Sequence, residues 1–188
     1  MNIPWGSDPA KKFVTNVGLI TSTGPYGDNI MSAEWTHQVS YEPGLIAICL
    51  KSSEATHTNI EETKEFGVNL SAQDQNVLAS VAGGNSGKNV NKIEVLKELG
   101  FRFFRAKKIN ALMVGGAALN VECRLVNTIE LGDHTTFVGE AVEVHQVTVK
   151  EPLVYHGQKF WKFGDNIPWT SEQEMNKIKS IVEKHTKR

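Results

Sequence analysis

Short stretches of strand-forming residues, each ended by a tight turn, constrain the fold of this chain more than any other feature. Turn chemistry is dense at 24–28 (Gly-Pro-Tyr-Gly-Asp), 42–44 (Glu-Pro-Gly) and 132–133 (Gly-Asp). Roughly seven strand patterns result, and they cover residues 13–23, 30–40, 45–50, 66–70, 117–131, 134–147 and a hairpin of 153–155 with 159–163. Because these strands do not alternate with long helices, they favour a mainly β fold with short helices, a closed or nearly closed β-barrel, over a doubly wound parallel sheet.

The helical patterns are few and short. They cover residues 56–64, 74–81, 93–99 and 171–187. Thr56 is predicted to cap the first of them. Ser171, with Glu174 three residues later, has the spacing of a capping box for the last. The glycine-rich segment 83–87 predicts a flexible loop between two helices.

Composition and charge exclude several classes of protein. Of the 188 residues, 40% are hydrophobic and 22% charged, and the net charge is −1 with a pI near 6.6. These values give no support for a general binder of nucleic acids or membrane surfaces. No run of about 18 apolar residues is present, and the N-terminus has no apolar signal core, so we expect a cytoplasmic protein. The length suits a single domain, 1–188, in which 164–188 form a C-terminal helical extension.

The cysteines and histidines form no recognisable disulfide or metal pattern. Cys49 and Cys123 lie far apart, and neither a CxxC nor an HExxH motif is present. We therefore expect no disulfide framework, as in other proteins of a reducing compartment, and no metal site. Cys49 ends an apolar strand, where a small core residue is a commoner role than a reactive thiol.

Residues 45–57 carry the strongest functional signal. The run Leu45–Leu50 is apolar at every position, which predicts a central strand buried on both faces. A small polar loop and the start of a helix follow it. A helix start presents unpaired N–H groups and the positive end of the helix dipole, so it can hold a phosphate. The polar side chains available there are those of Lys51, Ser52, Ser53, Thr56 and His57. An ordinary capped helix after a surface loop is the alternative interpretation of this spacing.

Three further features have both a functional and a structural interpretation. His134 begins a strand after a tight turn, where it could donate a proton to a reduced ring system or be a solvent-exposed turn residue. Trp35 and Trp161 could stack on a ligand or pack in the core. The segment 83–88 is similar to a P-loop, but Ala82 stands where the first glycine is needed, so a mobile loop is the better interpretation.

Eight segments, in their order and spacing, carry a resemblance to a known family. They are Asn-Ile-Met-Ser-Ala-Glu-Trp at 29–35, Pro-Gly at 43–44, Ile-Ala-Ile-Cys-Leu at 46–50, Ala-Thr-His-Thr-Asn-Ile at 55–60, Phe-Gly-Val-Asn-Leu-Ser at 66–71, Glu-Cys-Arg-Leu-Val at 122–126, the run 132–142 and Pro-Leu-Val-Tyr-His at 152–156. Together they resemble the flavin reductase-like, FMN-binding split-barrel family, which includes flavoredoxin and small archaeal ferric reductases. The resemblance covers most of residues 10–160.

The resemblance implies a split β-barrel that binds FMN at a homodimer interface. The residues that would line the isoalloxazine ring are Met31, Ser32, Ala33, Glu34 and Trp35. Those that would hold the ribityl phosphate are Leu50, Lys51, Ser52, Ser53, Thr56 and His57. Those that would close the site beside the ring are Asn69, Leu70 and Ser71. By the same resemblance, the catalytic residue His134 would face the flavin or nicotinamide.

The activity that the resemblance implies is reduction of a small acceptor by NAD(P)H through bound FMN. The acceptor would be free flavin, a ferric chelate or a redox protein. A flavoredoxin-type FMN electron carrier without nicotinamide activity is the alternative. A pyridoxamine-phosphate-oxidase-like flavoenzyme would need a phosphate motif rich in Arg and Lys, which Lys51 alone supplies poorly. The sequence has no dinucleotide fingerprint, so the use of NAD(P)H rests on the resemblance.

Overall fold

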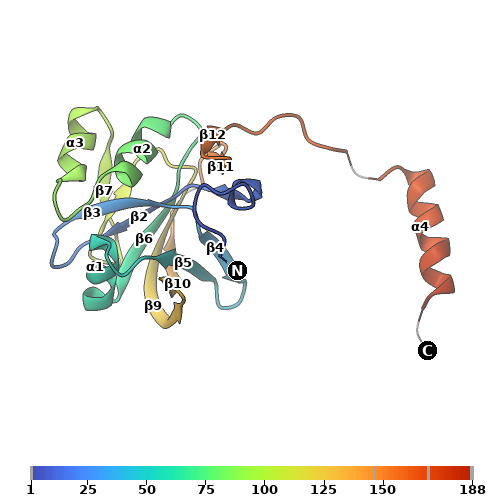
Figure 1. Cartoon of the computed structure of the whole chain (residues 1–188), viewed down its shortest axis with the longest axis horizontal. Coiled ribbons are helices and arrows are strands. Elements are labelled where there is room, and N and C mark those ends of the chain that lie inside the picture. The colour runs from blue at the N-terminus through green and yellow to red at the C-terminus, as the bar shows by residue number, and fades with distance from the viewer. Residues whose placement is uncertain (1, 146, 169, 187–188) are drawn as a thin grey trace.

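The computed structural model describes residues 2–145, 147–168 and 170–186. Its main sheet has seven antiparallel strands in the order β3-β2-β6-β9-β10-β5-β4 (Figure 1). The strands of this sheet are β2 (Gly18–Ser22), β3 (Asn29–Ala33), β4 (Thr36–Ser40), β5 (Leu45–Leu50), β6 (Glu65–Leu70), β9 (Leu119–Leu131) and β10 (His134–Val144). The predicted mainly β fold is therefore confirmed.

The two edge strands of this sheet are consecutive in the chain, which closes the sheet into a barrel. Only Glu34 and Trp35 lie between β3 and β4. β3 pairs with β2 at one edge of the sheet, and β4 pairs with β5 at the other. The Cys49 N–H donates to the Trp35 carbonyl oxygen at 3.0 Å, where the two edges meet. Among the described strands, β3 pairs only with β2, so its other edge is free. We call the opening between this free edge and the chain that follows β5 the split.

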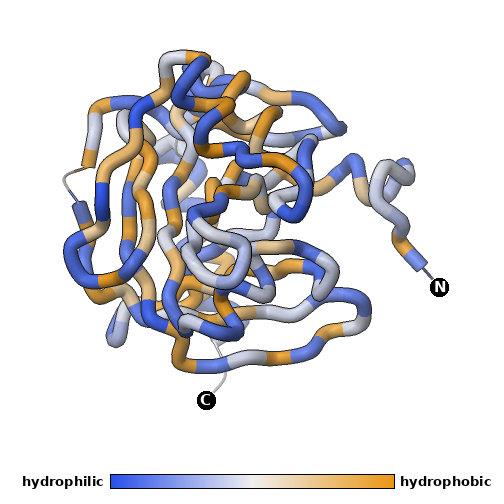
Figure 2. Tube along the Cα trace, turned by 90° about the vertical axis from the view of Figure 1, so that its left-hand side faces the viewer, coloured by the Kyte–Doolittle hydropathy of each residue, from blue (hydrophilic) through white to orange (hydrophobic). Residues whose placement is uncertain are grey.

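Alternate side chains of the strands fill the barrel. Phe66 and Val68 on β6, Cys123 on β9 and Phe137 on β10 are at most 1% exposed and pack in one cluster. Full burial of such a side chain contributes about 1.5–3 kcal/mol. Gly139 on β10 leaves room for this packing, because a Cβ there would overlap the Phe66 ring. In Figure 2 hydrophobic residues follow the strands of the body, and hydrophilic residues mark most of the turns.

A second apolar core lies outside the barrel, against β2 and β3. It joins Leu19 and Ile30 of these strands to helix α2 (Asn76–Gly84) and helix α3 (Lys92–Glu98). Helix α1 (Ala55–Thr63) follows β5 and also contacts β2 and β3. The remaining short elements are a 3-10 helix (Ala10–Lys12), β7 (Phe103–Arg105) paired with β8 (Leu112–Val114), and a small sheet of β1 (Val14–Asn16), β11 (Val154–His156) and β12 (Lys159–Trp161).

The C-terminal helix α4 (Glu172–Lys184) lies apart from the barrel (Figure 1). Its predicted capping box is present. The Glu174 N–H donates to Ser171 Oγ at 3.3 Å, and the Ser171 N–H donates to Glu174 Oε2 at 3.0 Å. The helix ends at Lys184 with His185 as its C-cap, so the predicted end at Lys187 is too late. Lys187 itself lies outside the described residues, as does Gln146 of the predicted strand 134–147. None of the helices in the described ranges combines the length and the apolar character that crossing a membrane requires.

Two predictions about the barrel strands are wrong in detail. Residues 30–40 do not form one strand, because the chain passes from one edge of the sheet to the other at Glu34 and Trp35. β5 is not buried on both faces. Ile48 and Leu50 are buried in the barrel, whereas the alternate residues face outward and are partly exposed.

The predicted helix boundaries also need correction. Thr56 does not cap α1, since Glu54 occupies the N-cap position and Thr56 lies within the helix. Gly83 and Gly84 end α2 rather than belonging to a loop. The predicted strand 13–23 is two strands, which separate at Val17 and join different sheets.

Candidate functional site

The start of helix α1 lies at the split and leaves its first backbone donors unused. The chain turns between Lys51 and Glu54, where the Glu54 N–H donates to the Lys51 carbonyl oxygen at 3.1 Å. The Glu54 side chain makes no capping hydrogen bond. Within the described ranges, the N–H groups of Ala55, Thr56 and His57 have no acceptor. A helix start with free N–H groups and no acidic residue in its first turn can hold an anion.

Thr56 adds a buried hydroxyl donor to this corner. Its side chain is 1% exposed, and its Oγ1 accepts a hydrogen bond from Asn29 Nδ2 at 2.8 Å. Because Asn29 supplies the proton of that bond, the Thr56 hydroxyl keeps its own proton for another acceptor. No residue of the described chain takes that proton. A buried donor without a partner costs about 1–3 kcal/mol, which an anionic acceptor would relieve.

Lys92 completes the corner, and sequence reasoning missed it. Its side chain is 3% exposed, and Nζ donates to the Ala82 carbonyl oxygen at 3.0 Å. Burial lowers the pKa of Lys92 to about 8, while the nearby Glu54 charge acts in the opposite direction. An ammonium has three protons, so Lys92 can offer an anion at the start of α1 both charge and donors. Asn29 belongs to the sequence motif at 29–35, so it could have been predicted as a site residue. The sequence around Lys92 does not distinguish it from a solvated lysine.

The loop before α1 faces the start of β10. Lys51, Ser52 and Ser53 are exposed. The pKa of Asp133 is lowered, chiefly by a hydrogen bond with His134 and additionally by the charge of Lys51. The structure therefore brings the predicted phosphate loop close to the predicted catalytic histidine.

The His57 side chain ties α1 to β10. Its Nε2 lies 2.9 Å from Thr135 Oγ1, and its Nδ1 lies 3.2 Å from the Glu61 carboxylate. The ring also meets Phe137 edge-on, with the ring centroids 4.9 Å apart. Since both ring nitrogens have partners in the protein, the backbone N–H is the part of His57 that is free for a ligand.

Trp35 and His134 pack together beside the loop that precedes α1. Their ring centroids lie 4.6 Å apart, and the Trp35 side chain remains 47% exposed. His134 Nδ1 lies 2.8 Å from Asp133 Oδ1. A carboxylate on Nδ1 fixes the orientation of the imidazole and leaves Nε2 for another partner. This pair can offer a planar ligand an aromatic surface and a proton donor.

The predicted ring-lining segment contributes backbone more than side chains. Met31 packs against the barrel core and Ala33 is buried in it. The Ser32 hydroxyl donates to the Ala79 carbonyl oxygen at 2.7 Å, and Glu34 accepts from Trp5 Nε1 at 3.0 Å. Leu50, also predicted, is a core residue at 1% exposure. These side chains are engaged within the protein. The peptide groups on the free edge of β3 are therefore the groups that can hydrogen-bond a ligand.

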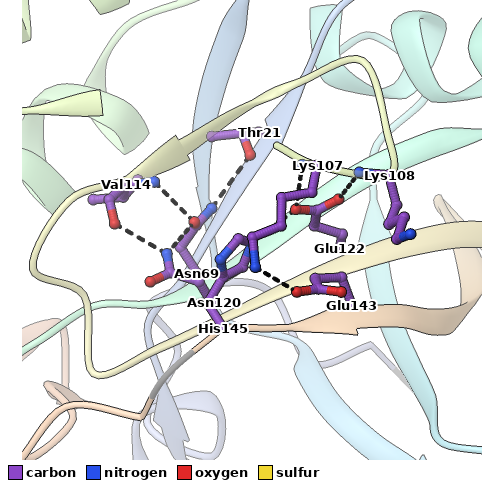
Figure 3. Close-up of polar contacts among 9 residues, drawn as sticks. All are labelled: Thr21, Asn69, Lys107, Lys108, Val114, Asn120, Glu122, Glu143 and His145. Carbon is purple, nitrogen blue, oxygen red and sulfur yellow. Dashed lines mark hydrogen bonds and ion pairs between the residues drawn. The ribbon is translucent and has the colours of Figure 1, made fainter. Parts of the chain in front are cut away.

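The predicted residues 69–71 are not joined to this corner. Asn69 Nδ2 donates to the Leu19 carbonyl oxygen at 2.8 Å. Asn69 Oδ1 accepts from Asn120 Nδ2 at 2.6 Å and from the Val114 N–H at 2.9 Å (Figure 3). Leu70 lines an apolar cavity of about 280 Å³ at the mouth of the barrel. Ser71 is buried, and its hydroxyl has no hydrogen-bond partner among the described residues.

A second buried polar cluster lies beside Asn69, around Glu122. The Glu122 carboxylate is fully buried and accepts from the Lys107 and Lys108 N–H groups at 2.7 and 2.6 Å, with His145 Nε2 at 2.7 Å (Figure 3). Burial alone would raise the pKa of Glu122, but these hydrogen bonds outweigh it and lower the pKa. The cluster fastens the segment between β7 and β8 to β9. No group of three or more His, Cys, Asp or Glu that could hold a metal occurs in the part of the chain that the structure covers.

Comparison with known proteins identifies the family. Residues 10–164 match the Flavin reductase like domain. The chain belongs to this family. The flavin reductase-like family expected from the sequence is thus confirmed, and the match ends where the C-terminal segment leaves the barrel.

Relatives of this flavin reductase-like chain span several organisms. An uncharacterised protein of Archaeoglobus fulgidus is 34% identical over 116 residues, which are 62% of this chain and 64% of that protein, slightly under two thirds of its length. An FMN reductase (NADH) of Stutzerimonas stutzeri is 23% identical over 153 residues, with 81% of this chain and 84% of that protein covered. The crystal structure of flavoredoxin from Methanosarcina acetivorans superposes with a TM-score of 0.77 at 22% identity, covering 94% of this chain and 98% of flavoredoxin, which shows the same fold.

Proposed function

We propose that this chain is an FMN-binding oxidoreductase that reduces flavin or another small acceptor with hydride from NAD(P)H. The observation that carries the proposal is the set of buried, unused donors at the start of α1 beside the free edge of β3. A phosphate monoester, with a charge of about −1.5 to −2 at neutral pH, suits those donors. The family match and the activity named for the Stutzerimonas stutzeri relative support the same function.

The residues that would hold the phosphate act through charge and through donated protons. Ala55, Thr56 and His57 present backbone N–H groups, and Thr56 adds its hydroxyl. Lys51, which is exposed, and Lys92, which is buried, would supply positive charge. Charge-assisted hydrogen bonds of this kind are about twice as strong as neutral ones. The exposed hydroxyls of Ser52 and Ser53 complete the predicted set.

The split itself would hold the ring system. The free edge of β3 offers N–H and C=O groups in line, and Trp35 offers an exposed aromatic surface at the end of that edge. FMN, when bound, supplies the redox chemistry, since it accepts and donates hydride. The exposed Trp35 side chain would leave its side of the site open to a co-substrate.

His134 is the proposed catalytic residue. The hydrogen bond between Nδ1 and Asp133 orients the imidazole, and the packing of His134 on Trp35 sets the position of Nε2. A proton on Nε2 can then be donated where negative charge develops during reduction, the usual task of a general acid. Residues 69–71, whose side chains do not reach the start of α1, are proposed only as neighbours that support the barrel wall.

We further propose that two copies associate through the outer face of β9 and β10. Ile129 and Leu131 are 41% and 56% exposed, and they lie directly opposite Thr136 and His134. An exposed apolar sheet face next to a site residue can bind the same face of a second copy. Sedimentation equilibrium at micromolar concentration tests this, and a monomer would refute the homodimer.

The two cysteines are unpaired, which supports the proposed cytoplasmic location.

The test of the activity is direct. Purified protein should bind FMN with a flavin absorbance spectrum and should oxidise NADH or NADPH when flavin or a ferric chelate is supplied as acceptor. Bound FMN without turnover by either nicotinamide would favour the electron carrier, and failure to bind FMN would refute the proposal as a whole.

A further inference from the structure

The apolar cavity of about 280 Å³ at the mouth of the barrel has no part in the function proposed above. It lies at the end of the barrel that is remote from the start of α1. Leu45 lines the cavity, whereas the loop before α1 follows Leu50, about 17 Å further along β5. Inward side chains of β5, β6, β9 and β10 form its wall, among them Ile46, Val68, Val121 and Ala141.

The barrel is hollow at this end because its inward residues on β10 are small. Phe137 fills the interior at the level of Ile48, the residue opposite it on β5. The next two inward positions of β10 are Gly139 and Ala141, and a Cβ at Gly139 would overlap the Phe66 ring. The interior beyond the phenylalanine rings is therefore left unfilled by β10.

The mouth of the cavity lies at β4. His37 and Gln38 line the cavity and are also exposed, so a ligand can enter between them and the barrel wall. Among the described residues that line it, none is Asp, Glu, Lys or Arg, and His37 is the only titratable one. An ion would lose its hydration there without gaining a partner of opposite charge, so the cavity suits a neutral molecule.

The volume indicates the size of that molecule. A dry apolar cavity of about 150 Å³ holds benzene. The cavity in this barrel is nearly twice as large, which is room for two fused aromatic rings. Flat rings also suit the branched aliphatic side chains of Val68, Val121 and Ile46, which offer dispersion contacts but no hydrogen bonds.

Asn16, at the end of β1, gives the cavity one specific polar requirement. Its Nδ2 donates to the Thr36 carbonyl oxygen at 2.6 Å. Only the NH₂ group can donate, so this bond fixes the orientation of the amide and identifies the other atom as the oxygen. That Oδ1 is shielded from solvent and has no hydrogen-bond partner among the described residues, and Asn16 lines the cavity. A buried acceptor without a partner is costly, and an N–H or O–H group of a ligand is what it lacks.

We propose that the open end of the barrel binds a neutral molecule of two fused aromatic rings that carries one N–H or O–H group. The rings lie against Val68, Val121 and Ala141, and the ligand donates its proton to Asn16 Oδ1. This site is separate from the proposed flavin site, and it does not require a flavin to be bound.

The experiment compares indole with benzofuran, which has the same shape but a ring oxygen in place of the N–H group. Calorimetry measures both dissociation constants for the wild-type protein, with and without an excess of FMN. We expect indole to bind with a dissociation constant of about 1 mM or lower. Benzofuran should bind about tenfold more weakly, because it leaves the Asn16 oxygen without a donor. FMN should change neither value.

Two variants locate the site. Asn16→Ala removes the acceptor, so indole and benzofuran should then bind with equal affinity. Ala141→Leu fills the cavity, so both affinities should fall at least about tenfold. Asn89→Ala, which changes an exposed asparagine between α2 and α3, is the control and should behave as the wild type. Thermal melts establish that each variant is folded, and Ala141→Val, a smaller addition, takes the place of Ala141→Leu if that variant does not fold.

Three results would overturn the proposal. The first is the absence of indole binding by the wild-type protein up to about 10 mM. The second is displacement of indole by FMN, or unchanged affinity in the Ala141 variant, since either would place indole outside this cavity. The third is equal affinity of the wild-type protein for indole and benzofuran, which would remove the role of Asn16 and with it the proposed class of ligand.

Discussion

Two buried polar regions lie in this protein, and they differ in how their hydrogen-bonding groups are used. Around Glu122 and Asn69, carboxylate and amide groups meet matching donors and acceptors from four segments (Figure 3). At the start of α1, three backbone N–H groups and the Thr56 hydroxyl proton have no acceptor among the described residues, and the buried Lys92 ammonium is close enough for the charge of the N-cap residue Glu54 to act on its pKa. Burial of polar residues alone therefore does not mark a binding site; an excess of donors does. We infer that the first region stabilises the fold and propose that the second binds an anion.

The largest expected effect is on stability, in the satisfied region. Glu122→Ala leaves His145 and two N–H groups without their acceptor, so we expect a loss of about 3–5 kcal/mol in the free energy of unfolding. Urea denaturation measures it. Glu143→Ala is the control, because Glu143 is a partly exposed carboxylate that also contacts this segment, through Lys107. The FMN affinity of the folded Glu122→Ala protein should be unchanged. A loss of FMN binding by this folded variant would contradict the assignment of the Glu122 region to stability alone.

The same carboxylate predicts a pH dependence. Because the pKa of Glu122 is lowered in the folded protein, its contribution to stability is fully present above the unfolded value of about 4.3. It is lost as the pH falls through the lower, folded pKa. Wild-type protein should therefore lose more stability than Glu122→Gln on acidification below about pH 4.3. Parallel acid titrations of the two proteins would contradict the assignment.

The second effect is catalytic. His134→Ala removes the proposed general acid, and general acid–base catalysis typically contributes at least about 100-fold. We expect kcat for NAD(P)H oxidation to fall by about 100-fold, with FMN affinity changed by less than threefold or so. Steady-state kinetics and fluorescence titration of one preparation measure both. Equal losses in kcat and FMN affinity would mean that His134 acts as a binding residue.

Lys92 should come next. Lys92→Met keeps the buried stem but removes the charge, and we expect FMN affinity to fall about 30-fold, as for the loss of charged hydrogen bonds. Because the pKa of Lys92 is about 8 in the free protein, wild-type affinity should decline as the pH rises above 8. The Met variant should lack that decline. An identical pH profile in both proteins would show that Lys92 only stabilises the fold, as the residues around Glu122 do, and does not bind the phosphate.

Thr56 should give the smallest of these effects. Thr56→Ala removes one hydroxyl donor, so FMN affinity should fall about fivefold, whereas Thr56→Ser, which keeps the hydroxyl, should restore it. His57→Ala, by contrast, should act on stability, since both ring nitrogens bond to protein groups. Fluorescence titrations together with thermal melts separate the two kinds of effect. A failure of Thr56→Ser to restore affinity would show that packing, not the hydroxyl proton, matters here.

Much of the fold could be predicted from the sequence because turns and strands are local features. A few consecutive residues are enough to predict three of these features: the hairpin turns at Gly24–Asp28 and Gly132–Asp133 and the capping box of α4. The break between strands at Glu34 and Trp35 cannot be predicted in this way, because it depends on how two sheet edges meet in space. The burial of β5 was overestimated for the same reason: an apolar run does not show which of its faces lies inside a barrel.

The candidate site was predicted less completely. The helix start after β5 was found because its strand, loop and helix are consecutive. Lys92 was missed because it reaches the corner from α3, a distant part of the sequence with no motif of its own. Asn69 is placed beside the ring by the family resemblance alone, and this stays a prediction; the hydrogen bonds of its amide to β8 and β9 could not be read from the sequence. Long-range packing decides both cases.

The most direct test of the phosphate corner compares FMN with riboflavin, which has the same ring system and ribityl chain but no phosphate. Fluorescence titration of the purified protein measures both dissociation constants under one set of conditions. If the start of α1, Thr56 and Lys92 hold the phosphate, FMN should bind at least about 100-fold more tightly than riboflavin. Equal affinity for the two flavins would contradict the account.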